Sequence, residues 1–331
     1  LQSTLSDLFS GIVLNTTKPY QIDDWIAIDG TEGRVLDIDW RATRLQTSQG
    51  SMVVIPNSLA SKAKITNFSR PVDVHGLSVS VQVSPHARPQ KVIEALERAT
   101  LGCRLLLSTP AASVAMKSTS SSGAEYEISC FVADMGHKRE VRNQLFDLAF
   151  RHLQASGIGL LSAAEPVQAA TLSRPRALLD ASSIFSTLRQ DEKDTFSQNM
   201  HLQTYRAGET ILAQGEVSDH LFIIESGVVS VTMQHDGKPF EAGRMGPGEV
   251  IGEAGVVADQ ATVAQFAAKT FCSLYRIDNE FLKPCLDARH DINEAMKNLL
   301  DFRRHMAQTL SQAAPKPVPR KGFLQWLRSR T

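Results

Sequence analysis

Residues 248–263 read GEVIGEAGVVADQATV, in which a short apolar run is broken by glycines just before a helix-forming segment. A helix that begins after Gly252 leaves its first backbone N–H groups unpaired and turns the positive end of its dipole outward, so it would attract an anion. Glu253 follows at once and supplies a carboxylate acceptor for hydroxyl groups. This stretch therefore predicts a site for an anionic group, with a carboxylate acceptor beside it.

The whole chain has an ordinary globular composition. Its 331 residues are 42% hydrophobic and 21% charged, a balance that allows about two or three domains with sizeable cores. Lys and Arg together number 35, as do Asp and Glu, so the chain has no net charge. Because no global positive field is present, we expect no nucleic-acid partner, and any membrane-surface contact must use a local patch.

Several kinds of site are not expected. The four cysteines lie far apart without a CxxC pair, which argues against a metal or disulfide framework and favours small buried hydrophobes in a reducing compartment. The nine histidines are scattered and have no nucleophile or acid at a recognised spacing, so we expect no catalytic residues, no cofactor and no enzymatic activity. No uncharged run approaches the roughly 20 residues that span a bilayer.

The first half of the chain divides into three segments. Residues 1–17 carry apolar side chains at helical spacing, and the chain begins in the middle of this pattern, so we treat it as a fragment. Residues 18–70 contain short β-rich runs separated by glycine turns, which predicts a small twisted barrel. Residues 71–162 alternate strand, helix, strand and helix, which indicates an α+β module.

The second half begins with a connector at residues 163–180, which contains Pro166 and Pro175. Residues 181–312 alternate short strands with glycine turns and end in helical periodicity, as a jelly roll followed by helices would. Residues 313–331 start with a proline-rich linker. Phe323, Trp326 and Leu327 then lie among basic residues, which is typical of either a membrane-surface helix or a disordered basic tail.

The N-terminal motifs carry a family resemblance. KPYQIDDWIAIDGTEGRV at residues 18–35, PNS at 56–58 and NFSRP at 67–71 resemble the small-conductance mechanosensitive (MscS) channel family. The resemblance implies that residues 1–17 end the third transmembrane (pore) helix, with Ser3 where the family usually has a glycine. It also implies a β domain at 18–70 and a ferredoxin-like α/β domain at 71–162.

The same resemblance implies an assembly and a location. Members of the family form rings, usually heptamers, so we expect a homo-oligomer. We also expect this region to lie in the cytoplasm below the inner membrane, with transmembrane helices upstream of Leu1.

The third module resembles the cyclic-nucleotide-binding domain family. The motifs are IFSTL at residues 184–188, which is similar to an entry helix, YRAGE at 205–209, QG at 214–215, LFIIESG at 221–227 and the opening stretch. The multidomain α+β fold would thus end in a β jelly roll with C-terminal helices. The resemblance implies cAMP or cGMP as ligand, and the implied contacts are Gly252, Glu253, Ala254, Thr262 and Val263, with Arg303 and Arg304 stacking on the purine.

The opening stretch departs from that family at one position. Its loop is about three residues shorter than usual, and Asp259 stands where the family has an arginine for the phosphate. A lost charge-assisted hydrogen bond costs roughly 1.5–3 kcal/mol, and a carboxylate about 4 Å from the phosphate would add up to about 4 kcal/mol of repulsion. Alternatively, Asp259 points to solvent while Arg206, Arg244, Arg303 or Arg304 supplies the charge.

Two functions are therefore weighed. The first is the cytoplasmic part of an MscS-like ion channel whose C-terminal domain senses a cyclic nucleotide and modulates gating through the helices at residues 278–310. The alternative is a mechanosensitive channel whose nucleotide-binding-like domain is ligand-free and acts in assembly or protein contacts. A transcription factor with the same sensor fold is not expected, because a linker and a short tail follow the sensor where a helix-turn-helix would be needed.

Overall fold

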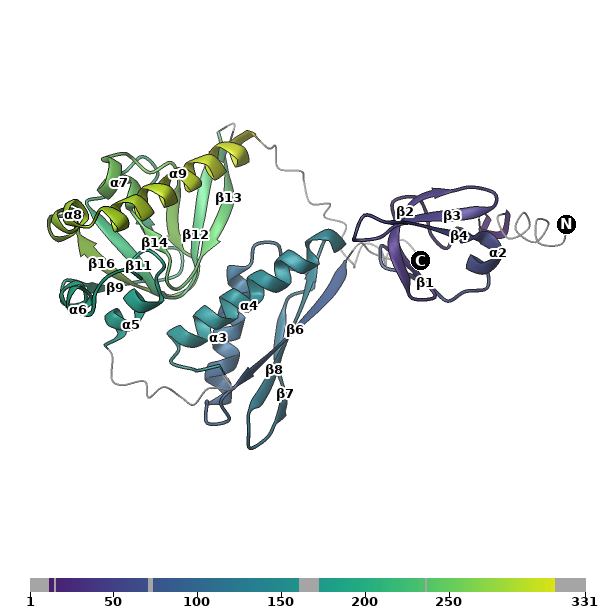
Figure 1. The fold of residues 1–331 in the computed structure, drawn as a ribbon, viewed down its shortest axis with the longest axis horizontal. Coiled ribbons are helices and arrows are strands. Elements are labelled where there is room, and N and C mark those ends of the chain that lie inside the picture. The colour runs from purple at the N-terminus through teal and green to yellow at the C-terminus, as the bar shows by residue number, and fades with distance from the viewer. Residues whose placement is uncertain (1–11, 15, 71–73, 161–172, 236, 313–331) are drawn as a thin grey trace.

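The computed structural model describes residues 12–14, 16–70, 74–160, 173–235 and 237–312, which form three bodies along the chain (Figure 1). The predictions for residues 1–11, including Ser3, and for the tail at 313–331 lie outside these ranges. Within them, none of the helices has the length and apolarity that crossing a bilayer requires.

The first body contains one antiparallel sheet of five strands in the order β4-β3-β2-β1-β5. Its elements are β1 (Trp25–Ile28), β2 (Thr31–Ile38), β3 (Ala42–Gln46), β4 (Met52–Pro56), α2 (Asn57–Ala60) and β5 (Ile65–Asn67). Because side chains alternate along a strand, Ile26, Val35 and Leu45 are turned inward and fully buried. Asn57, from the PNS motif, is also buried and accepts a hydrogen bond from the Thr43 hydroxyl at 3.2 Å, so this motif has a structural role.

The second body packs two helices on one face of a three-stranded sheet with the order β6-β8-β7. Its elements are β6 (His75–Val83), α3 (Pro89–Gly102), β7 (Ser113–Thr119), β8 (Ala124–Val132), a 3₁₀ turn (Met135–His137) and α4 (Lys138–Ala155). Strand β6 alternates buried and exposed residues along its whole length. Strand β7 was not predicted, because it is an edge strand whose side chains are almost all exposed and do not alternate between apolar and polar.

The third body is a jelly roll of two four-stranded sheets, with the orders β10-β15-β12-β13 and β14-β11-β16-β9. Its strands are β9 (His201–Tyr205), β10 (Thr210–Leu212), β11 (His220–Ser226), β12 (Val229–His235), β13 (Lys238–Met245), β14 (Val250–Ile251), β15 (Gln265–Ala268) and β16 (Cys272–Asp278). Strand β11 is buried over five consecutive residues, because it lies inside its sheet and is covered on both faces.

Five helices surround this jelly roll. They are α5 (Arg174–Ala181), α6 (Gln190–Gln198), α7 (Glu253–Ala258), α8 (Asn279–Ala288) and α9 (His290–Gln312). Helix α5 occupies the end of the segment predicted as a linker at 163–180, and its Leu179 is fully buried, so residues 174–180 belong to the third body. The predicted entry helix at residues 184–188 is wrong. That segment is a turn which places Phe185 in the core, and the helix that follows it is α6.

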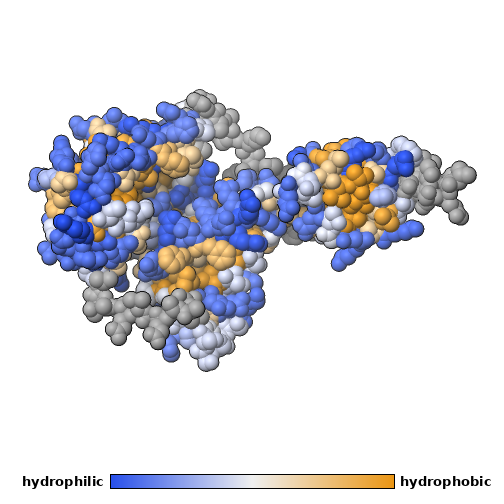
Figure 2. All heavy atoms as spheres, viewed as in Figure 1, coloured by the Kyte–Doolittle hydropathy of each residue, from blue (hydrophilic) through white to orange (hydrophobic). Residues whose placement is uncertain are grey.

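The first body also exposes a group of large apolar side chains. Figure 2 shows apolar atoms gathered on the visible face of this body. Among the described residues of this body, the exposed large apolar ones are Ile12, Val13, Ile22, Leu36, Trp40, Met52, Val54 and Leu59. An apolar area of this kind is typical of a surface that is covered by a partner.

Candidate functional site

The stretch at residues 248–263 forms a strand, a sharp turn and a short helix. Strand β14 ends at Gly252, whose φ of 100° lies in the left-handed region, and α7 begins at Glu253. A Cβ atom on Gly252 would lie 2.4 Å from the backbone oxygen of His220, and one on Gly255 would lie 2.1 Å from the backbone oxygen of Ser218. Both glycines are therefore required for the close packing of α7 against residues 218–220, whether or not a ligand binds.

A small cavity lies at the start of α7. Its lining residues are Leu212, Glu216, Ser218, Gly252, Glu253, Ala254, Gly255, Thr262 and Phe266. The structure thus brings together four of the predicted contacts, whereas Val263 does not line the cavity and is 54% exposed. The cavity measures about 10 Å³, which is close to the space that one water molecule needs. A nucleotide-sized ligand requires the site to open.

The carboxylate of Glu253 already has a partner. Glu253 is only 5% exposed, and its Oε1 atom accepts a hydrogen bond from Arg303 Nη1 at 2.7 Å. The same nitrogen donates to the backbone oxygen of Val250 at 2.9 Å. Arg303 comes from α9, which packs against α7. It therefore occupies the acceptor that the sequence assigned to a hydroxyl-bearing ligand. The neighbouring Arg304 bonds instead to the side chain of Gln260.

Asp259 does not face this cavity. It ends α7 in a left-handed conformation with a φ of 51°, its backbone N–H donates to Gly255 at 2.9 Å, and its side chain is exposed. The repulsion considered above for a carboxylate in contact with the phosphate therefore does not apply in this conformation. The cavity lining itself contains Glu216 and Glu253 but no lysine or arginine.

The other candidate cations lie elsewhere. Arg206 is exposed and does not line the cavity. Arg244 is paired with Glu241 and donates hydrogen bonds to the second body. Of the four arginines named as alternatives, Arg303 is the one that contacts a cavity-lining side chain.

Known protein families match all three bodies. The mechanosensitive ion channel beta-domain matches residues 3–70, and the C-terminal domain of the mechanosensitive ion channel MscS matches residues 76–160. Residues 3–70 and 76–160 thus match two domains of the MscS family. The cyclic nucleotide-binding domain matches residues 202–289, so the third body is a domain of that type.

Individual relatives agree with these matches. The MscS family protein YhdY of Bacillus subtilis (strain 168) is 40% identical over 106 residues, which are 32% of this chain and 27% of that protein. The miniconductance mechanosensitive channel MscM of Escherichia coli (strain K12) is 25% identical over 160 residues, 48% of this chain and 14% of that protein. The cAMP-dependent protein kinase type II regulatory subunit of Drosophila melanogaster is 29% identical over 115 residues, 33% of this chain and 30% of that protein. The chain thus spans less than a third of the length of each of these relatives.

Solved structures of both kinds also resemble parts of the chain. The closed state of Helicobacter pylori MscS superposes with a TM-score of 0.45 at 22% identity, covering 51% of this chain and 68% of that one. The Thermus thermophilus catabolite activator protein superposes with a TM-score of 0.35 at 23% identity, covering 38% of this chain and 60% of that one.

Sequence reasoning missed part of the cavity of the third body. Leu212, Glu216, Ser218 and Phe266 line it but were not predicted. They come from β10, from the turn that follows it and from β15, which are distant in sequence from Glu253. The turn at Gln214–Gly215 was predicted, but no pattern in the neighbouring sequence indicates that Glu216, the next residue, lines a cavity beside α7.

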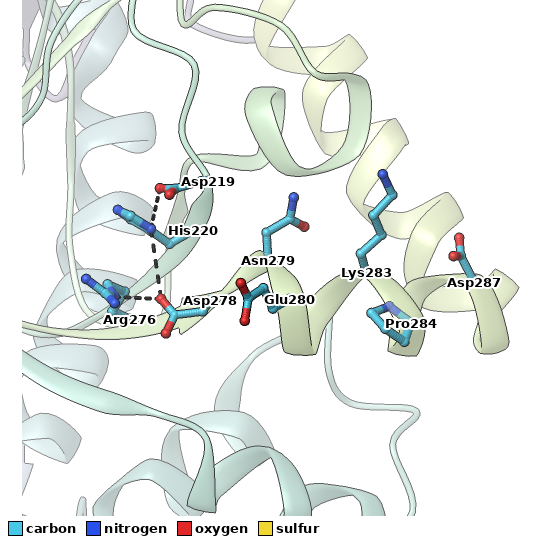
Figure 3. Close-up of a pocket in the computed structure, with 9 residues that line it drawn as sticks. All are labelled: Asp219, His220, Arg276, Asp278, Asn279, Glu280, Lys283, Pro284 and Asp287. Carbon is cyan, nitrogen blue, oxygen red and sulfur yellow. Dashed lines mark ion pairs between the residues drawn. The ribbon is translucent and has the colours of Figure 1, made fainter.

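A second hollow of the same domain lies away from residues 248–263. Figure 3 shows this open groove, of about 810 Å³, beside the start of α8, where His220 and Arg276 point toward acidic neighbours. Its lining residues are Asp219, His220, Arg276, Asp278, Asn279, Glu280, Lys283, Pro284 and Asp287. Asp278 pairs with Arg276 at 2.8 Å, and four carboxylates face two permanent cations. The groove is therefore poorly suited to an anionic ligand.

Proposed function

We propose that this chain is the cytoplasmic part of a homo-oligomeric MscS-type ion channel, in which the C-terminal domain binds cAMP or cGMP and thereby modulates opening of the pore. The matches to two MscS-family domains and the cyclic-nucleotide-binding domain support this proposal. The exposed apolar side chains of the first body support an oligomer. Location at the inner membrane and the seven subunits usual in the family are parts of the same proposal, and no enzymatic activity is included.

The contact between Arg303 and Glu253 carries the gating part of the proposal. Arg303 Nη1 lies 2.7 Å from Glu253 Oε1, so a ribose hydroxyl that approaches this carboxylate competes with the guanidinium for its lone pairs and for the space beside it. Leaving Glu253 also separates Arg303 from the oxygen of Val250. A bound nucleotide therefore competes with the present position of Arg303. A ligand that binds one of two states better than the other shifts the balance between them.

The phosphate end of the site makes this binding weaker than is usual for such domains. Among the residues that the structure describes, no lysine or arginine lines the cavity, so the phosphate would be held mainly by backbone N–H groups at the start of α7. Absence of one charge-assisted hydrogen bond corresponds to about 1.5–3 kcal/mol, or a roughly ten- to hundredfold loss of affinity. We expect dissociation constants in the micromolar range or above.

A second candidate keeps the channel but gives the C-terminal domain a ligand-free role in assembly or protein contacts. The observation that favours it is the same closed cavity, in which Arg303 already satisfies Glu253 and an arginine for the phosphate is lacking. In this case Arg303 would be a permanent structural partner of Glu253.

Calorimetric titration of cAMP and cGMP into the full chain distinguishes the two candidates. If Arg303 competes with the ligand, Arg303→Gln should bind nucleotide at least about tenfold more tightly than the parent. Arg304→Gln is the matched control, because Arg304 is adjacent on α9 but bonds to Gln260, outside the cavity. Glu253→Gln should weaken binding in either background. Absence of binding heat for the parent and for Arg303→Gln would support the ligand-free candidate.

A further inference from the structure

The second and third bodies are joined by arginines that reach across to each other's backbone. Arg104, just after α3, donates from Nη1 to the backbone oxygens of Glu241 and Ala242, at 3.0 Å each. In the opposite direction, Arg244 at the end of β13 donates from Nη1 to the backbone oxygen of Leu101 at 2.9 Å. Figure 1 shows α3 and α4 lying between their own sheet and the third body. We call this contact the arginine junction.

Arg244 is well placed to end α3. The last carbonyl groups of a helix have no intrahelical partner and carry the negative end of the helix dipole. Helix α3 ends at Gly102, and Arg244 donates to the oxygens of Leu101 and Cys103, at 2.9 and 3.4 Å. Glu241 holds the guanidinium through two hydrogen bonds, at 2.8 and 2.9 Å. A residue of the third body thus acts as the C-terminal cap of a helix in the second body.

The turn that precedes β14 contacts α4 in the same junction. Arg151 Nη1 lies 3.3 Å from Glu249 Oε2, and the same oxygen accepts a hydrogen bond from the backbone N–H of Gly246 at 2.8 Å. A Cβ atom on Gly246 would lie 3.5 Å from His152 Nε2, which is ordinary contact distance. This turn is therefore packed directly on α4.

The same short segment is held by α9 from its other end. Val250 directly follows Glu249, and its backbone oxygen accepts a hydrogen bond from Arg303 of α9. Glu253, three residues further on, is paired with Arg303 itself. Residues 246–253 therefore contact the α/β domain at one end and Arg303 of α9 at the other.

We infer that the arginine junction is the surface by which the cyclic-nucleotide-binding domain docks on the α/β domain of its own chain, and that residues 246–253 transmit the state of Arg303 to α3 and α4. The docking does not depend on the proposed function. The transmission rests on the proposed function, because it is the bound nucleotide that would displace Arg303. Release of Arg303 loosens residues 246–253 and, through Arg151 and Arg244, the contact with the second body.

Hydrogen exchange of the full chain, without nucleotide, tests the docking. Arg104 is exposed, and its side-chain hydrogen bonds go to Glu241 and Ala242 of the third body. Arg104→Ala should therefore speed exchange in residues 238–251, in the other body, by about fivefold or more. Arg142→Ala is the control, because Arg142 is an exposed residue of α4 outside the junction. Unchanged exchange in residues 238–251 for Arg104→Ala would overturn the docking.

The transmission is tested with two adjacent arginines of α9. Arg303→Ala should speed exchange both in residues 246–253 and in residues 98–104 of the second body, whereas Arg304→Ala should change neither. Faster exchange confined to residues 246–253 would overturn the transmission and leave the docking intact. If Arg303→Ala also speeds exchange in β11 and β16, the domain has unfolded, and Arg303→Lys is used instead. This variant keeps the charge but not the planar guanidinium, so we expect a smaller increase in exchange in residues 246–253 and 98–104. Both exchange experiments are done without nucleotide, so their outcome does not depend on whether the calorimetric titration detects nucleotide binding.

Discussion

At the scale of single residues, Gly255 allows α7 to pack directly against the backbone of Ser218. A side chain at this position would collide with the backbone of Ser218, at 2.1 Å from its oxygen and 2.6 Å from its nitrogen, and backbone cannot rotate away. We expect Gly255→Ala to lower the free energy of unfolding of the third body by about 1–3 kcal/mol, the range for overpacking. Urea-induced unfolding of the full chain, followed for the third body, measures it.

Gly243→Ala is the matched control for this change. A Cβ atom on Gly243 would meet nothing within 4 Å, so the same substitution should be neutral or slightly stabilising. Equal stability of the two variants would show that α7 can shift away from residues 218–220, and that the glycine is not needed for packing.

At the scale of secondary-structure elements, α5 is held to α6 by buried charges. The ammonium group of Lys193 in α6 lies 2.7 Å from Asp180 in α5, and the Lys193 side chain is only 7% exposed. Arg176 of α5 contacts Asp194 and Gln190 of α6 in the same way. Because Asp180 remains 37% exposed, we expect Lys193→Ala to cost only about 1–2 kcal/mol of stability.

Thermal unfolding measures the loss of stability in Lys193→Ala. The control is Lys283→Ala, which removes an exposed lysine from α8. If Lys193→Ala were no more damaging than the control, the ion pair would contribute nothing measurable, and α5 would be held only by its apolar residues such as Leu179.

At the scale of the whole molecule, His152 makes stability depend on pH. It is buried in α4 near the turn of the third body, and burial, together with Arg98 and Arg151, lowers its pKa from 6.5 to about 3. Below pH 6.5 the unfolded chain takes up a proton that the folded chain does not bind. The free energy of unfolding should therefore fall as the pH falls from about 6.5 toward 3.

His152→Leu should flatten this part of the pH profile, because it removes the group that takes up the proton. His86→Ala, which changes an exposed histidine of the same body, should leave the slope unchanged. Unfolding by urea at a series of pH values measures both. A parent-like slope in His152→Leu would show that other groups account for the acid sensitivity.

Sequence patterns were most reliable where a local signal existed. The β-rich runs at residues 25–28, 34–38 and 52–55 lie in strands, because alternation and glycine turns are local properties. Strand β7 lacks that alternation since it is an exposed edge. The helix at residues 184–188 was predicted from a family resemblance, whereas the segment is a turn that buries Phe185. The contacts of Gly252, Glu253 and Ala254 with one cavity could be predicted because these residues are consecutive in the chain.

The sequence by itself determined the three kinds of domain and their order, the glycines that α7 requires and the absence of an arginine at position 259, because each of these depends on neighbouring residues. Only the tertiary structure decided that Arg303 pairs with Glu253, 50 residues away, that Asp259 faces solvent and that Arg244 caps α3. These outcomes depend on how separate elements pack. A long, flexible charged side chain can reach several partners, and packing determines which of them lies within hydrogen-bonding distance.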